Sequence, residues 1–102
     1  MTGQEIIEAL GITEADQATK DSLLQNIYVV VELRVMSVLG EIITDEQMDH
    51  LEQMEKDGAT KNDMLWWLGE NVASAHEAIE AMTRDYVEEM KRKMASIQNS
   101  LE

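Results

Sequence analysis

Two pairs of a histidine and a carboxylate come closest to a metal or acid–base site in this sequence. Glu46 and His50 are four residues apart, as are His76 and Glu80, so each pair shares one face if its segment is helical. A di-iron bundle site needs Glu three residues before His, and neither histidine has one there. The zinc motif HExxH is also absent. We therefore expect no metal site and interpret both pairs as ion pairs on helix surfaces.

Other arrangements that would indicate catalysis or cofactor binding are missing from the sequence. It has no GxSxG motif, phosphate-binding loop or dinucleotide fingerprint, and no Ser, Thr or His is spaced as a nucleophile with its base. A calcium loop centred on Gly58 would place Gln53 and Met64 where carboxylates are required. Without cysteine there are no thiolate metal sites or disulfides. We expect a protein that is not an enzyme, with no cofactor and no evident small-molecule substrate.

Charge limits the partners of the chain. Its 21 acidic and 8 basic residues give a net charge of −13, which repels nucleic-acid phosphates and anionic lipids. We therefore expect no direct nucleic-acid binding and no membrane association. A candidate acidic face lies in the segment after Thr44 and consists of Asp45, Glu46, Asp49, Glu52 and Glu55. The only basic cluster is Lys91-Arg92-Lys93.

The sequence favours a cytoplasmic protein. Its first residues lack the basic and then apolar pattern of a secretory signal. The longest apolar stretch, Ile27 to Leu39, is interrupted by Glu32 and Arg34 and is shorter than the roughly 18–20 residues that span a bilayer.

The elements that would position these residues are all predicted to be helical. The chain has no proline, and its apolar residues recur at spacings of three and four. We predict an all-α single domain, residues 1–102, built as a compact bundle of four to five helices. A long central hydrophobic helix would span about residues 14–43, capped by Thr13, and a long C-terminal helix about residues 75–99.

Glycines and capping residues set the remaining boundaries. Glycines are predicted to end three short helices: Gly11, Gly58 and Gly69. Thr44 and Gln47 fit a capping box. Ser74 and Glu77 fit a second one, with Asn71 as an alternative cap one turn earlier.

The central helix is the most informative segment of the sequence. Its predicted core row is Leu24, Ile27, Val31, Val35, Val38 and Ile42. The β-branched run from 27 to 31 would fit a buried strand, but the helical spacing continues through both flanks. A second row, formed by Val29, Leu33 and Met36, is also apolar. A helix that is apolar nearly all round is central in its domain or buried against another chain.

Aromatic residues and Arg34 are further candidates for contacts. Neighbours on a helix point about 100° apart, so one ring of Trp66 and Trp67 is expected inside and the other at the rim. The outer ring is a candidate anchor for a partner, because tryptophan dominates interface hot spots, and Tyr28 is interpreted in the same way. We expect Arg34 to pair with an acid on another helix.

Methionines replace phenylalanine as apolar filler. The predicted row on the last helix is Ile79, Met82, Tyr86, Met90, Met94, Ile97 and Leu101. Such a row serves as core or as an oligomer interface. The full set of candidate partner or oligomer contacts is Tyr28, Val29, Leu33, Met36, Trp66, Trp67, Met90 and Met94.

The order of these features resembles a known family. The features are Leu10-Gly11-Ile12, an apolar helix with Arg34-Val35, the acidic helix from Thr44, a Gly58 loop, the Leu65–Leu68 helix and a final amphipathic helix. It resembles a domain-of-unknown-function family of small acidic all-helical proteins from candidate-phyla-radiation bacteria, over about residues 5–94. The resemblance implies a helical fold and a cytoplasmic setting, but no activity and no site residues. The chain has Ala73-Ser74 where the family leads one to expect proline.

Together these observations favour a non-enzymatic protein–protein interaction or homo-oligomerisation module. There is more apolar surface than one small bundle needs, which predicts a homodimer or a complex with another protein. The alternative is an acidic inhibitor or nucleic-acid mimic that docks on a basic partner surface through the candidate acidic face.

Overall fold

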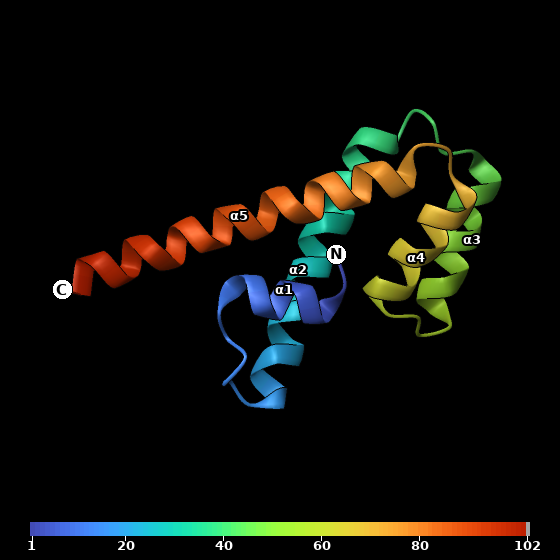
Figure 1. Cartoon of the computed structure of the whole chain (residues 1–102). Coiled ribbons are helices and arrows are strands. Elements are labelled where there is room, and N and C mark those ends of the chain that lie inside the picture. The colour runs from blue at the N-terminus through green and yellow to red at the C-terminus, as the bar shows by residue number, and fades with distance from the viewer. Residues whose placement is uncertain (102) are drawn as a thin grey trace.

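The computed structural model describes the backbone of residues 1–101 and the side chains of residues 1–96, and it is all-α (Figure 1). The helices are α1 (Gly3–Leu10), α2 (Gln17–Leu39), α3 (Asp45–Lys56), α4 (Lys61–Asn71) and α5 (Ala75–Leu101). The described part of the chain contains no strand. The prediction of a helical bundle with two long helices is therefore confirmed, and the β-ribbon alternative for residues 27–31 is excluded.

α1 begins and ends at the residues that local chemistry favours. The Thr2 hydroxyl accepts from the Glu5 N–H, and the Glu5 carboxylate accepts from the Thr2 N–H, which satisfies N–H groups that a helix start leaves free. Gly11 ends the helix in the left-handed region, with φ of 71°, as predicted. Ile6, Ile7 and Leu10 are buried.

α2 is shorter at both ends than predicted. Its N-cap is Asp16, whose carboxylate accepts from the Thr19 N–H at 2.8 Å, whereas Thr13 lies in the preceding turn. The helix ends at Leu39, and the turn that follows exposes Ile42. The predicted cap and the boundaries at about 14 and 43 were therefore wrong by three or four residues.

One row of α2 forms the centre of the core. Ile27, Val31, Val35 and Leu39 are almost fully buried, and α2 packs chiefly against α4 and α5. Val38, predicted to belong to this row, is 54% exposed.

α2 also meets a length and composition criterion for crossing a bilayer, with a mean hydropathy of 1.4 over 18 residues. The run from 27 to 39 is too short for this, but the helix extends to 23 residues. Core helices of globular proteins and signal sequences meet the same criterion, and 22% of this window is buried inside the bundle.

α3 and α4 form a helical hairpin at one end of the molecule (Figure 1). The predicted capping box of Thr44 and Gln47 is present at the start of α3, and Thr60 forms another at the start of α4. On α3, Leu51 is buried but Met48 is exposed. Gly69 does not end α4, which continues to Asn71.

The start of α5 differs from the prediction. Ser74 directly precedes α5, and its carbonyl accepts from the Ala78 N–H. Its φ of 65° lies in the left-handed region, and neither side-chain bond of the predicted capping box with Glu77 forms. Asn71 is not the cap either, because it is the last residue of α4 and its side-chain amide donates to the Trp67 carbonyl of that helix. The helix begins at Ala75, close beside α4. A Cβ placed on Gly69 would lie 3.8 Å from the His76 Cα.

α5 crosses the other helices and then extends beyond them (Figure 1). Ala75, Thr83 and Val87 are buried, and the predicted residues Ile79, Met82, Tyr86 and Met90 pack partly buried around the core. From Lys91 to Ser96 every side chain is exposed. The predicted row members Ile97 and Leu101 lie outside the described side chains.

Candidate functional site

The outward side of α2 carries apolar residues that the fold does not bury. Leu33 is 68% exposed and Val29 40% exposed. Each lies two residues from the buried Val31, which places it about 200° around the helix from the core row. Tyr28 and Met36, also predicted contacts, are partly buried against the core instead.

This outward side of α2 carries no charged residue. We call it the α2 face and define it as Ser22, Asn26, Val29, Val30, Leu33 and Ser37. The two charged residues within this span, Glu32 and Arg34, are paired with other helices. Lys61 of α4 lies 3.0 Å from the Glu32 carboxylate, and Arg34 pairs with Glu89 of α5. The α2 face is therefore a neutral strip about 23 Å long on a strongly acidic chain.

Arg34 has the structural role predicted for it. Its guanidinium binds both carboxylate oxygens of Glu89 and lies 5.0 Å from the centre of the Tyr86 ring. The hydrogen bonds to Glu89 raise the pKa of Arg34 and lower the pKa of Glu89. The pair fixes α2 against α5 and keeps this charge off the α2 face.

The two tryptophans divide as predicted. Trp67 is half-buried against the core, and His50 of α3 stacks on it with ring centres 4.3 Å apart. Trp66 is 72% exposed. Trp66 therefore remains the candidate anchor, whereas Trp67 joins α3 to α4.

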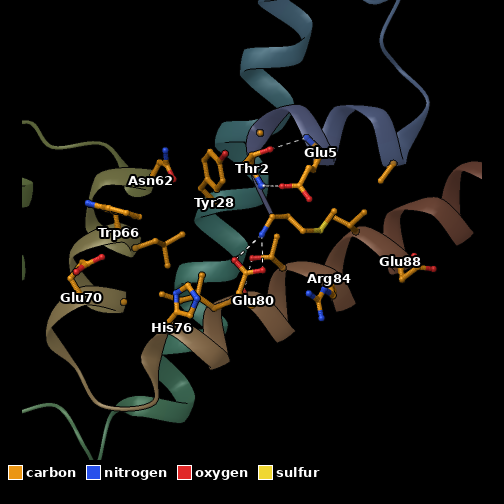
Figure 2. Close-up of a pocket in the computed structure, with 18 residues that line it drawn as sticks. Thr2, Glu5, Tyr28, Asn62, Trp66, Glu70, His76, Glu80, Arg84 and Glu88 are labelled. Carbon is orange, nitrogen blue, oxygen red and sulfur yellow. Dashed lines mark hydrogen bonds and ion pairs between the residues drawn. The ribbon is translucent and has the colours of Figure 1, made fainter.

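Trp66 stands at the edge of a groove of about 970 Å³ between α1, α4 and α5 (Figure 2). Apolar side chains of Leu65, Ile79 and Val87 line part of it. The polar residues lining it include Tyr28, Asn62, Glu70, His76, Glu80 and Arg84. Asn62, Trp66 and Glu70 repeat every four residues on α4, a signal present in the sequence. That α1 and α5 would complete the groove could not be read from local spacing.

The groove lacks the geometry of an acid–base or nucleophilic centre. The Thr83 hydroxyl donates to the Ile79 carbonyl at 2.7 Å, and within the described residues His76 has no hydrogen-bond partner that could orient it. The Met1 ammonium donates to both oxygens of Glu80 at 2.7 Å. Burial raises the pKa of Tyr28, which disfavours its phenolate.

Neither predicted ion pair between histidine and glutamate forms. His50 stacks on Trp67, and Glu80 binds the N-terminal ammonium in place of His76. Contacts with residues on other parts of the chain are thus formed in place of the ion pairs that the spacing of four residues along a helix predicted. Across the described residues, no group of three or more His, Asp or Glu side chains is arranged to hold a metal ion.

The candidate acidic face is exposed along α3. All five of its residues are exposed, and within the described part of the chain only Glu55 forms an ion pair, with Lys61 at 4.0 Å. Asp45, Asp49 and Glu52 recur at spacings of four and three, so they lie in one row. This row points away from the buried Leu51.

The extending end of α5 presents the remaining candidates. Met90 still packs against the core, but Met94 is 40% exposed. Lys91 pairs with Glu88 on the same helix at 3.3 Å, whereas Arg92 and Lys93 have no ion-pair partner among the described residues. The α5 end, defined as Lys91–Ser96, thus combines an apolar side chain with three basic residues, of which Arg92 and Lys93 add to the lowering of the pKa of Glu89 by Arg34.

Comparison of the chain with protein-family models, curated proteins and solved structures finds no match.

Proposed function

We propose that this chain is a non-enzymatic interaction protein that forms a homodimer through the α2 face. The observation that carries the proposal is Leu33, a large apolar side chain 68% exposed at the middle of a long helix. The neutral strip around it supports the proposal.

The α2 face is not required to fill the core. The opposite row of α2 is already buried against α4 and α5, so the outward apolar residues add little to folding. Apolar surface in water is unfavourable by roughly 25 cal/mol per Å². Association that covers it recovers that free energy.

A second copy of the chain is the occupant that fits best. A two-fold axis brings the same face of each protomer together. For a chain with net charge −13, self-association costs least where no charges meet. A neutral strip with its charged neighbours held on other helices meets this requirement. Anionic lipid is a poorer occupant, because the rest of the surface repels it.

Sedimentation equilibrium or light scattering at tens of micromolar tests the proposal. The wild-type chain should have about twice its mass of 11.6 kDa, and Leu33→Glu should be monomeric. Val38→Glu is the matched control, because Val38 is also an exposed apolar residue of α2 but lies about 140° away from Leu33. This control should stay dimeric. A wild-type monomer, or equal effects of the two substitutions, would reject the proposal.

The acidic row of α3 favours a second candidate function, an acidic inhibitor or nucleic-acid mimic. Four of the five acids of the candidate acidic face, Asp45, Glu46, Asp49 and Glu52, are exposed and form no ion pair within the described residues, and their charge would steer a basic partner. Binding to such a partner should weaken steeply with salt and with Asp49→Lys or Glu52→Lys. A partner isolated from the native cell whose binding ignores both changes would exclude this function.

A further inference from the structure

We propose that the groove between α1, α4 and α5 binds a basic peptide segment of another protein, with a lysine or arginine side chain of that segment held between Trp66 and Glu70. The groove is a surface separate from the α2 face, since no residue of the α2 face lines it. Binding there therefore goes beyond the proposed homodimer and does not depend on it.

Trp66 and Glu70 of α4 offer a site for a cation. They are four residues apart, so they lie on the same face of the helix, and Figure 2 shows both on the α4 side of the groove. Trp66 is 72% exposed. Glu70 is exposed too and forms no ion pair among the described residues. A cationic side chain placed between them would lie against the indole ring and pair with the carboxylate.

Charged groups on the α1 and α5 sides of the groove already have partners within the chain. The Met1 ammonium binds both oxygens of Glu80 at 2.7 Å. The bond from the Thr2 N–H lowers the pKa of Glu5, and the positive charge of Arg84 adds to this effect. A cation that enters the groove therefore finds these carboxylates occupied.

The two remaining titratable groups of the groove do not neutralise Glu70. Glu88 pairs with Lys91 of its own helix at 3.3 Å. The His76 Nδ1 lies 3.8 Å from a Cβ placed on Gly69, but the imidazole forms no ion pair with Glu70. Glu70 is thus the one carboxylate lining the groove that, among the described residues, has neither a cation nor a hydrogen-bond donor.

The shape of the groove fits a peptide. Along α5 the groove runs from His76 to Glu88, which corresponds to about 18 Å of helix. That length matches about three turns of a helix or about five extended residues. The partly buried Ile79 and the Trp66 ring provide apolar surface for the uncharged side chains of such a segment. A small amine would fill little of a groove of about 970 Å³.

Charge favours a basic segment over other occupants. A second copy of the chain carries a net charge of −13 and would bring that charge to a surface that contains carboxylates, unlike the neutral α2 face. Nucleic acid and anionic lipid are repelled for the same reason. A basic peptide is attracted by the whole chain and is then positioned by the unpaired Glu70.

A synthetic peptide of leucine and lysine tests the groove. It has about 12 residues, with the leucines at helical spacings. Titrations at about 0.1 M salt, where distant charges are screened, measure its dissociation constant. Trp66→Ser and Glu70→Lys should each weaken binding by about tenfold. Glu52→Lys makes the same charge change at an exposed site on α3 and should weaken binding by less than about threefold.

Tryptophan fluorescence locates the bound peptide. The peptide has no aromatic residue, so any change in emission comes from the protein. The emission of the wild type should shift to shorter wavelength, because the peptide covers the exposed Trp66 ring. Trp66→Phe, which retains Trp67, should show no shift. Circular dichroism confirms that the helices of each variant are intact.

Leu33→Glu separates the groove from the proposed function, because it should abolish the dimer without weakening peptide binding. If the wild type is monomeric but the Trp66 and Glu70 effects are found, the homodimer is wrong and the groove stands. The groove proposal is wrong, and the α2 face unaffected, if the peptide does not bind, if Glu52→Lys and Glu70→Lys have equal effects, or if the emission does not shift. Weaker binding to Leu33→Glu would place the peptide on the α2 face and also overturn the groove.

Discussion

Arg34 of α2 binds Glu89 of α5 through both terminal nitrogens, with N–O distances of 2.5 and 3.2 Å. The guanidinium also lies over the Tyr86 ring. This two-pronged geometry is more specific than a single contact. It joins the two longest helices across 55 residues of sequence.

The Arg34–Glu89 pair predicts a pH-dependent contribution to stability. Arg34 lowers the pKa of Glu89 from its ordinary 4.5, so the unfolded state takes up the proton first as the pH falls. The contribution is complete above about pH 4.5 and is lost as the pH falls through the folded-state pKa. Glu89→Gln should lower the Tm at pH 7 and have a smaller effect at pH 3, followed by circular dichroism. Glu88→Gln, which removes only a bond to Lys91 of the same helix, should have little effect at either pH.

The start of α2 gives a second prediction. Asp16 caps the helix and its pKa is lowered by the bond from Thr19, so Asp16→Asn or Asp16→Ala should distinguish charge from capping. Alanine should lower the Tm at pH 7, and asparagine, itself a good cap, should lower it less. The alanine effect should fade as the pH falls below Asp16's ordinary value of 3.8. Thr13→Ala should leave the Tm unchanged, and a larger loss with Thr13→Ala than with Asp16→Ala would contradict the observed helix start.

Local sequence signals predicted the helix ends well where a residue forms hydrogen bonds with backbone groups of its own sequence neighbours. Gly11 ends α1, and the Thr44 capping box starts α3, because both use groups within four residues. Predictions from the sequence were wrong where contacts between residues far apart in the chain determine a helix boundary. Gly69 looked like a helix end, yet α4 continues through it, and a Cβ at this position would make only ordinary van der Waals contacts with His76 and Ile79 of α5.

The candidate surfaces were likewise predictable where they depend on one helix and not predictable where they depend on several. The periodicity of α2 separated Leu33 from the core row correctly, since the two rows differ only in angle around one helix. The sequence of α4 could not tell which of Trp66 and Trp67 points outward, because that depends on where α3 packs and on the stacking of His50. The groove needs α1, α4 and α5 together, and no local pattern carries that information.

Ser74 provides a third prediction, on the junction between α4 and α5. Its φ of 65° costs a non-glycine residue about 1–2 kcal/mol, and glycine adopts this region freely at an entropic cost of about 0.5–1 kcal/mol. Ser74→Gly should therefore raise the free energy of unfolding by about 0.5–1 kcal/mol in urea titrations. A capping serine would give the opposite sign, a loss of a few tenths. Gly11→Ala, which imposes the reverse change at φ of 71° with open space around it, should be destabilising.

The last prediction separates folding from association with two valines of one helix. Val31 is fully buried and Val29 is 40% exposed on the α2 face, and both are truncated by the same two methyl groups. Val31→Ala should lower the free energy of unfolding by roughly 1.5–3 kcal/mol, because a cavity forms in the core. Val29→Ala should change the stability of the monomer by less than about 0.5 kcal/mol.

Protein concentration distinguishes the two effects. If the α2 face forms a dimer, the Tm of the wild type rises with concentration, because the partner binds only the folded chain. Val31→Ala should shift this whole curve downward, whereas Val29→Ala should flatten it, since less free energy is gained on association. Thermal melts from low micromolar to hundreds of micromolar measure both. Two curves shifted in parallel, or a wild-type Tm independent of concentration, would show that the exposed row of α2 has no partner in a second copy.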